Sequence, residues 1–308
     1  MKCYTTLNKD ENSLLNVETI SENDLVIAEQ YEYKIEDKVK TSYRYYVIKS
    51  DNIEDSYDKL LKLMNSKDNH YFELVQAHDP IKPFGDIDLS DSKENTYLSD
   101  LKKSIEDKVE FYGSKFRSLD HYRKEFKRAI IIACQEIFEQ QHGYNEYDGI
   151  NVLFPESTTN DKISFHFVCD KITLPNIFHA EQFTNQVIKR LEHCFRKFID
   201  LSVYKKTQNL RYPWSTKVGK SNYKKLKEDK PNITELKKLS LKYTKDNVYN
   251  LQFELPQAVE KVKEKVKKEN KDESMSSKYL AYVEQEFEED YSIKVSTDEY
   301  DEDFFQLI

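Results

Sequence analysis

The sequence predicts an α+β fold, a sheet-containing core with flanking helices, and three observations support this class. The chain has 308 residues, of which 38% are hydrophobic, enough for a substantial buried core. Apolar residues recur at period two in some segments and at intervals of three and four in others, without strict strand–helix alternation. Tyrosine (22) and phenylalanine (17) are abundant whereas glycine (5) is scarce, which argues against glycine-rich phosphate loops and collagen-like repeats.

The first predicted elements lie between residues 42 and 75. Residues 42–49, S-Y-R-Y-Y-V-I-K, are aromatic and β-branched and predict a strand with Arg44 near its start. Residues 54–64 place apolar side chains three and four positions apart, which predicts a short helix. A second strand is expected over residues 71–75.

Residues 84–89, F-G-D-I-D-L, predict a short strand, because Pro80 and Pro83 interrupt the pattern before them. Alternate side chains of a strand point the same way, so Asp86 and Asp88 project together, about 7 Å apart along the chain. Two hard carboxylate donors at this spacing suit Mg²⁺ or Mn²⁺. An isolated D-x-D is also typical of a strand edge with solvated acids, so its meaning depends on the other motifs.

Three more elements are expected in the middle of the chain. Apolar residues at helical spacing predict a long amphipathic helix over residues 122–137 that ends at Gly143. Residues 149–155 predict a strand. A further helix over residues 183–198 is expected to run directly into an apolar segment that contains Asp200.

Residues 162–169, K-I-S-F-H-F-V-C, alternate polar and apolar side chains and predict a strand. Lys162, Ser164 and His166 then share one face. Such a row of hydrogen-bond donors suits phosphate oxygens. Alone it indicates little, since polar strand faces are commonly hydrated and a single histidine is more often structural than a ligand.

The segment that follows Asp200 is basic and aromatic and contains Arg211 and Lys217. A third carboxylate therefore lies close in sequence to side chains that bind phosphate. G-K-S at residues 219–221 resembles the end of a P-loop, but Trp214 occupies the earlier glycine position and no apolar strand precedes it. We therefore reject an ATPase site here.

Charge is unevenly distributed along the chain, whose formal net charge is −8. Residues 205–245 contain thirteen basic residues and three acidic residues, whereas residues 284–308 contain ten acidic residues and one basic residue. The basic segment is of the kind that neutralises phosphates. Apolar periodicity is lost after Pro256, so we expect a domain over residues 1–255, then a charged linker and acidic tail over residues 256–308.

Cysteine usage and hydropathy indicate a soluble, intracellular protein. The four cysteines include no C-x-x-C pair, so neither a zinc site nor a disulfide framework is expected. No apolar run approaches the roughly 20 residues that span a bilayer, and the first residues lack a secretory signal. We expect the nucleus or cytoplasm, or a viral replication site if the protein is virus-encoded, and no membrane partner.

Three segments occur in the order and spacing of a known motif set. P-F-G-D-I-D-L resembles the D-x-D/E motif of archaeo-eukaryotic primases, and D-K-I-S-F-H-F-V resembles their S-x-H motif. I-D-L-S-V-Y-K-K-T-Q-N-L-R, followed by S-T-K-V-G-K, resembles their third motif. Over residues 44–220 the chain therefore resembles the primase-polymerase type of the archaeo-eukaryotic primase superfamily, close to the herpesvirus and poxvirus primase branch.

The resemblance implies a primase catalytic core with a recognition-motif-like sheet and flanking helices. The implied activity is template-directed nucleotidyl transfer from nucleoside triphosphates onto a primer or initiating nucleotide on single-stranded DNA. Two Mg²⁺ or Mn²⁺ ions would be bound by the three carboxylates, Asp86, Asp88 and Asp200. The nucleotide would be bound by Arg44, Lys162, Ser164, His166, Arg211 and Lys217.

The chain departs from its relatives because no Cys/His zinc module follows Lys220. The resemblance therefore supports primer extension more strongly than primer initiation. The ending D-E-Y-D-E-D-F-F-Q-L-I suits a motif that docks on a single-strand-binding protein, and a replicative helicase is another expected partner. A solvating tail, a packed last helix, or an acidic brake over the basic segment remain alternatives for this ending.

Two competing functions remain open at this point. One is a catalytically weak accessory protein that binds single-stranded DNA during replication. The other is a D-x-D metal-dependent glycosyltransferase, which would account for the paired carboxylates and leave the other two motifs unexplained.

Overall fold

The computed structural model describes residues 3–7, 13–36, 38–65, 69–142, 150–226 and 232–255. The chain divides into two compact units, Met1–Glu254 and Leu255–Ile308. The expected helix end at Gly143 and the expected linker and tail over residues 256–308 lie outside the described residues.

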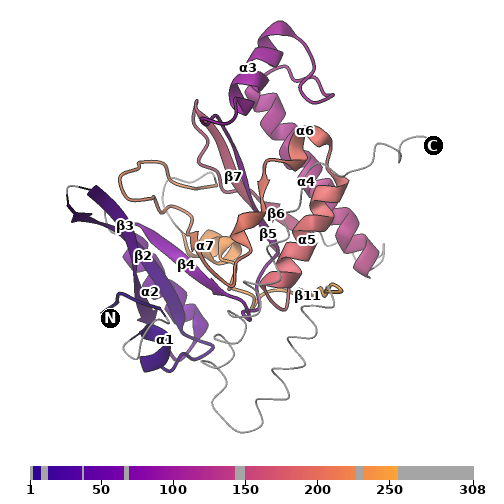
Figure 1. Cartoon of the computed structure of the whole chain (residues 1–308). Coiled ribbons are helices and arrows are strands. Elements are labelled where there is room, and N and C mark those ends of the chain that lie inside the picture. Colours follow the sequence, from indigo (N-terminus) through magenta and orange to yellow (C-terminus); the bar gives the residue numbers. More distant parts are fainter. Residues whose placement is uncertain are drawn as a thin grey trace. The chain divides into compact units, whose positions relative to one another are not determined.

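Helices mix with two main antiparallel sheets, which agrees with an α+β fold (Figure 1). The five-stranded sheet has the order β1-β3-β2-β4-β10, with bounds Cys3–Tyr4, Lys38–Ile48, Leu25–Ile35, Tyr71–Gln76 and Thr207–Arg211. The four-stranded sheet has the order β6-β7-β5-β9, with bounds Asn151–Leu153, Lys162–Asp170, Phe84–Ser90 and Ile199–Asp200. A small parallel pair joins β8 (Ile172–Thr173) to β11 (Tyr249–Asn250).

The four-stranded sheet has one apolar face, which is covered by two long helices, α4 (Leu119–His142) and α5 (Ile177–Arg190) (Figure 1). Its alternating apolar side chains join those helices in one buried cluster, to which α3 (Tyr97–Asp107) and the short α6 (His193–Arg196) also contribute. Packing is tight at Gly85, where a Cβ atom would lie 2.3 Å from the Phe167 ring. A glycine is therefore required at this point of β5.

Helices α2 (Ile53–Met64) and α7 (Ile233–Leu239) pack against one face of the five-stranded sheet. Asn52 caps α2 by accepting a hydrogen bond from the Asp55 amide, and Asn232 caps α7 in the same way through Glu235. On the other face a smaller cluster includes the short α1 (Leu14–Val17).

Most predicted elements are confirmed, and one is wrong. Strands form within the five expected segments between residues 42 and 169, and helices form over residues 54–64 and 122–137. The single helix expected over residues 183–198 is instead two helices, because Leu191 takes an extended backbone conformation (φ −79°, ψ 152°) and ends α5. Strand β2 and helix α3 were not anticipated. No helix in the described ranges is long and apolar enough to cross a bilayer.

Candidate active site

The register of the four-stranded sheet brings the predicted carboxylates and the S-x-H residues together. On the central strand β5, Asp86 is paired with His166 of β7 on one side and with Asp200 of β9 on the other. Asp88 is paired with Ser164 in the same way. Directly opposed residues of an antiparallel pair point to the same face, so all five lie on the face opposite the helices.

Two lysines and a histidine contact the carboxylates on this face. His166 Nε2 lies 2.9 Å from Asp86 Oδ1, and Lys224 Nζ lies 2.9 Å from the same oxygen. Lys162 Nζ lies 2.7 Å from Asp88 Oδ2. The Lys162–Asp88 pair is at the open side of the site, where both side chains are more than one third exposed, whereas Lys224 is 5% exposed.

Asp200 is oriented by the turn that follows it. Its Oδ1 atom accepts a hydrogen bond of 2.8 Å from the Ser202 amide, at the start of a single turn of 3₁₀-helix, Leu201–Val203. This contact fixes one carboxylate oxygen at the N-terminus of the turn. The apolar segment therefore ends with a carboxylate held next to Asp86.

Arg211 and Lys224 reach the site from the two ends of one loop. Arg211 ends β10 of the five-stranded sheet, and its guanidinium donates to the Asn222 carbonyl (2.9 Å) and to Ser157 Oγ (3.4 Å). The loop over residues 212–223 then returns the chain to Lys224. A narrow cleft of about 20 Å³ lies between the two sheets, and its lining includes Asp86, His166, Arg211 and Lys224. It has room for a water molecule or an ion.

Burial and charge set the protonation states at this cleft. Burial lowers the pKa of Lys224 to about 8, although the attraction of Asp86 acts in the opposite direction. Burial alone would raise the pKa of Asp86, but His166 and Lys224 outweigh it and hold this pKa well below its ordinary value. Burial, and then the charge of Lys224, lower the pKa of His166. At neutral pH we therefore expect an ionised Asp86 beside a neutral imidazole that donates through Nε2.

The donor set suits a hard divalent cation. Its predicted members are carboxylate oxygens, and Asp88 Oδ1 is buried without a hydrogen-bond partner among the described residues. That oxygen retains the capacity to bind a cation. Within the part of the chain that the structure describes, no three His, Cys, Asp or Glu side chains form a ready metal cluster; instead, lysine ammonium groups neutralise Asp86 and Asp88.

Two predicted nucleotide ligands, Arg44 and Lys217, do not line the cleft. Arg44 is in the middle of β3, in the row of Glu29 and Tyr71, whereas Arg211 belongs to the adjacent row, with Phe72. Adjacent rows of a sheet point to opposite faces, so Arg44 and Arg211 project from opposite faces of the five-stranded sheet. Lys217 is exposed in the loop over residues 212–223.

Sequence reasoning missed Lys224. It is one of thirteen basic residues between positions 205 and 245, and nothing in the local pattern distinguishes it from its exposed neighbours. Burial makes it distinct, since a lysine that is 5% exposed needs a partner, and Asp86 is that partner. The available signal was only the general one, a basic segment that follows the third carboxylate.

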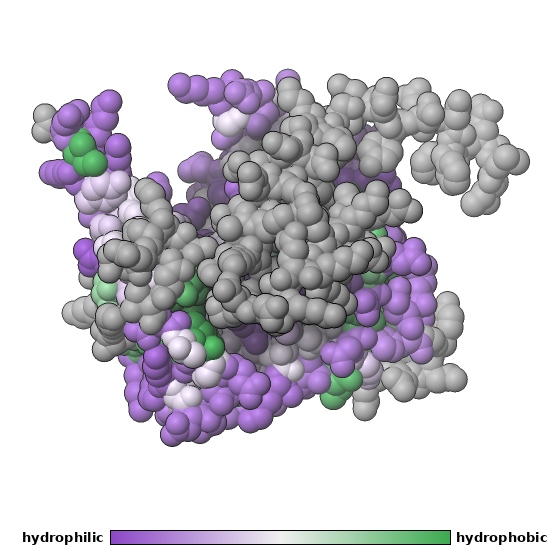
Figure 2. Space-filling model, turned by 60° about the horizontal axis from the view of Figure 1, so that its bottom comes forward, coloured by the Kyte–Doolittle hydropathy of each residue, from purple (hydrophilic) through white to green (hydrophobic). Residues whose placement is uncertain are grey.

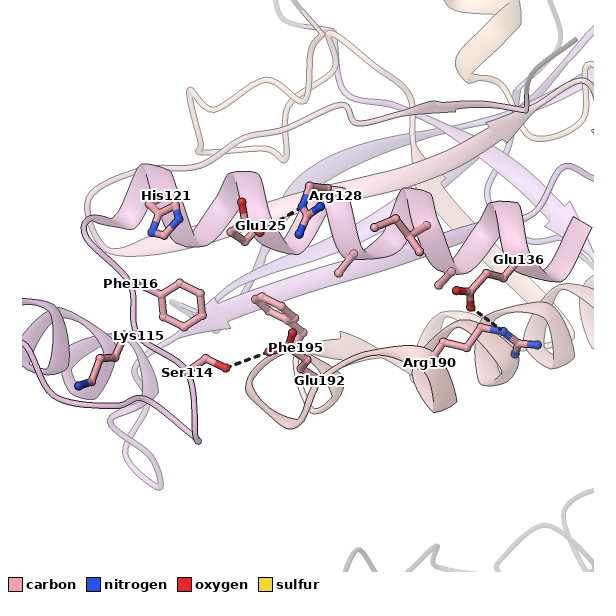
Figure 3. Close-up of a pocket in the computed structure, with 13 residues that line it drawn as sticks. Ser114, Lys115, Phe116, His121, Glu125, Arg128, Glu136, Arg190, Glu192 and Phe195 are labelled. Carbon is pink, nitrogen blue, oxygen red and sulfur yellow. Dashed lines mark hydrogen bonds and ion pairs between the residues drawn. The ribbon is translucent and has the colours of Figure 1, made fainter. Parts of the chain in front are cut away.

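A second cavity, of about 360 Å³, shares no lining residue with the cleft (Figure 3). It is bounded by α4, by the end of α5 and by α6, and Phe116 and Phe195 contribute its apolar wall. Two of its arginines are paired with acids in Figure 3, Arg190 with Glu136 at 3.5 Å and Arg128 with Glu125 at 3.2 Å. None of the predicted site residues lines this cavity.

A comparison of the chain with protein-family models and with curated proteins finds no match. The chemistry of the site is therefore inferred from its residues and their geometry.

Proposed function

We propose that this protein is a DNA primase-polymerase, which transfers nucleotides from nucleoside triphosphates onto a primer on a single-stranded DNA template. One observation carries the proposal: Asp86, Asp88 and Asp200 share a strand face with Ser164 and His166, and cationic side chains surround them. This is the combination that phosphoryl transfer requires, since catalysis there consists mainly of positioning and charge stabilisation.

The topology of the four-stranded sheet supports the same reading. Its strands and covering helices follow the chain order β5-α4-β6-β7-α5-β9, and the spatial order is β6-β7-β5-β9. This is the order of ferredoxin-like and RNA-recognition-motif sheets. We therefore infer a recognition-motif-like primase core, with helices on one face and the reaction on the other.

The carboxylates would hold two Mg²⁺ or Mn²⁺ ions. When bound, such ions lower the pKa of the attacking hydroxyl and neutralise the pyrophosphate leaving group. Asp200 is kept in place by the Ser202 amide, and Asp88 offers its unpartnered Oδ1 atom. Lys162 pairs with Asp88, and Lys224 pairs with Asp86. If metal ions took over the carboxylates, both ammonium groups would be close enough to contact phosphate oxygens instead.

Arg211 is suited to hold the triphosphate. Its Nε atom is buried and has no hydrogen-bond acceptor among the residues described, and it carries a charge that Asp86 and Asp88 attract. An oriented guanidinium donor of this kind recognises phosphate oxygens. His166 orients Asp86 through Nε2 and adds a further polar group to the same face.

The direct test is incorporation of labelled nucleotides by the purified chain on primed single-stranded DNA. We expect extension that requires template and Mg²⁺ or Mn²⁺ and that stops with a chelator. A parallel reaction on unprimed circular single-stranded DNA shows whether initiation occurs without a zinc module. DNA binding without incorporation would support the accessory function instead, and sugar transfer from a nucleotide sugar would support the glycosyltransferase.

A further inference from the structure

Strands β2 and β3 extend beyond the five-stranded sheet as a two-stranded ribbon. Their pairing continues to Ile35 and Lys38, whereas β4 pairs with β2 only at residues 27–29 and β1 pairs with β3 only at residues 45–46. Residues 31–35 and 38–44 therefore form a projection, hereafter the ribbon. Figure 1 shows it at the free end of β2 and β3, and Figure 2 shows it at the upper left as a largely hydrophilic arm with an apolar patch.

Strand periodicity gives the ribbon two different faces. Register places aromatic, apolar and basic side chains together on one face, hereafter the tyrosine face: Tyr31, Tyr33, Ile35, Lys38, Lys40 and Arg44. The opposite face contains Glu32, Lys34, Val39, Thr41 and Tyr43, and the Tyr43 ring packs edge-on against Phe72. The two faces have the same backbone and differ in chemistry.

The tyrosine face exposes flat apolar groups next to cations. Tyr33 is 38% exposed and Ile35 is 45% exposed. The rings of Tyr31 and Tyr33 lie 5.9 Å apart, and the Arg44 guanidinium stacks 4.2 Å above the centre of the Tyr31 ring. A tyrosine covered by a guanidinium is a planar platform that remains charged, and bases stack on such platforms in complexes with single-stranded nucleic acid.

We propose that the tyrosine face of the ribbon binds single-stranded nucleic acid, which in the proposed reaction is the template strand. Aromatic rings interleaved with cations match the two parts of a single strand, its bases and its phosphates. Lys38, Lys40 and Arg44 supply the positive charge. The acid nearest to them on this face, Glu29, lies at the base of the ribbon and accepts a hydrogen bond from Tyr46.

The face of β2 opposite the tyrosine face is in contact with the loop that carries the site cations. The Val218 amide donates to Gln30 Oε1 at 3.0 Å, and a side chain at Gly219 would come within 3.2 Å of Glu32. This is the loop whose ends are Arg211 and Lys224, and it exposes Lys217 and Lys220. The loop therefore contacts the base of the ribbon from the face opposite the tyrosine face.

The inference gives Arg44 a different role from the one expected of it. Resemblance to primases implied a ligand of the incoming nucleotide, whereas the register puts Arg44 on the ribbon, on the face opposite Arg211. Only the identity of the bound strand as a template rests on the proposed function. Binding itself can be measured without catalysis.

The test measures affinity for a fluorescein-labelled oligothymidylate by anisotropy, with a chelator present and no nucleotide. Tyr33→Ala should weaken binding about tenfold, because one stacking platform is lost. Lys40→Ala should weaken it several-fold at low salt and lower the salt dependence by about one counterion. Lys34→Ala is the matched control: it removes the same charge from the opposite face and should change affinity less than about twofold.

The outcomes separate this inference from the proposed function. Equal affinity of Tyr33→Ala, Lys40→Ala and the wild-type chain would overturn the ribbon inference, whether or not nucleotides are incorporated. Loss of affinity in a chain that incorporates no nucleotide would leave the ribbon as a binding surface and remove the primase proposal. A change of oligomeric state in light scattering, with DNA affinity unchanged, would identify the ribbon as a self-association surface and also overturn the inference. Circular dichroism confirms folding, since exposed substitutions rarely alter stability.

Discussion

Two buried lysine–aspartate pairs in this protein have similar geometry and different surroundings. Lys82 lies 3.1 Å from Asp170, with side chains 1% and 12% exposed, and Lys224 lies 2.9 Å from Asp86, with side chains 5% and 18% exposed. Lys82 also donates to the carbonyls of Lys237 and Lys238, at the end of α7, so all three of its protons are used. Among the described residues, Asp86 is the acceptor that Lys224 contacts.

The polar groups next to the two pairs also differ in whether their hydrogen bonds are satisfied. Close to Lys82, the buried Glu73 accepts hydrogen bonds from the Ser240 hydroxyl and from the amides of Leu241 and Lys242. Close to Lys224, Asp88 Oδ1 and Arg211 Nε are buried without partners in the described ranges. A buried charge with every hydrogen bond made serves the fold, whereas unsatisfied donors and acceptors retain the capacity to bind a ligand.

The largest expected effect is at Asp200, which is paired with Asp86 of the second lysine–aspartate pair. A substitution there should reduce catalysis and leave folding stability almost unchanged. Asp200→Asn keeps an N-cap acceptor for Ser202 and removes the charge, so nucleotide transfer should fall on the order of 10³-fold or more. The melting temperature should change by less than about 3 °C. Primer extension and thermal unfolding measure the two quantities. Asp161→Asn, on the exposed turn before β7, is the control, and near-normal transfer by Asp200→Asn would remove Asp200 from the site.

Lys82→Met should have the opposite profile. It leaves Asp170 and two carbonyls without their buried donor, which should lower the free energy of unfolding by about 3–5 kcal/mol. Transfer per folded molecule should be retained, because Lys82 contacts none of the site residues. Denaturant titration and activity on the folded fraction give both numbers. The exposed Lys93→Met should differ from wild type by less than about 0.5 kcal/mol, and an equally small change in Lys82→Met would show that the two pairs do not differ as described.

The same substitution at the other pair, Lys224→Met, sharpens the comparison. It frees Asp86 from a competing cation, so Mn²⁺ affinity without nucleotide should rise about tenfold, which corresponds to about 1.4 kcal/mol. Nucleotide affinity should fall, because one phosphate donor is lost. Electron paramagnetic resonance counts free Mn²⁺ and reports its binding directly, with the exposed Lys220→Met as control. Unchanged Mn²⁺ affinity would mean that Lys224 is as purely structural as Lys82.

The smallest effect concerns pH and the first pair's neighbour, Glu73. Burial raises its pKa above the ordinary value although three donors contact it. The folded state therefore binds the proton more tightly than the unfolded state, so the contribution of Glu73 is full below its unfolded pKa. That contribution is lost as pH rises through its folded pKa.

Glu73→Gln removes this titration. As pH rises above the ordinary pKa of a glutamate, the unfolding free energy of wild type should fall relative to the variant, by at most about 1.4 kcal/mol per pH unit. Urea titrations of both proteins at matched pH values measure this difference. Parallel pH profiles would show that Glu73 has no raised pKa in the folded protein.

Local periodicity was enough to define many elements and one half of the site. The alternation in residues 162–169 and 84–89 indicated both strands, and with them the side chains that share a face: Asp86 with Asp88, and Lys162 with Ser164 and His166. These groupings follow from backbone geometry alone, because the side-chain direction of a strand repeats every two residues. The amphipathic helices followed from the corresponding helical period.

Tertiary structure decided which of these faces meet. The pairing of Asp86 with Asp200 joins residues more than a hundred positions apart, and a shift of one residue in register would have turned either carboxylate away. The sequence could not indicate that Lys224 is buried against Asp86, that Leu191 interrupts a helical pattern, or that Arg44 projects from the ribbon. Sequence period fixes the direction of a side chain within its own element, but partners and burial depend on which distant segments pack together, because hydrogen bonds and apolar contacts between those segments outweigh local preference.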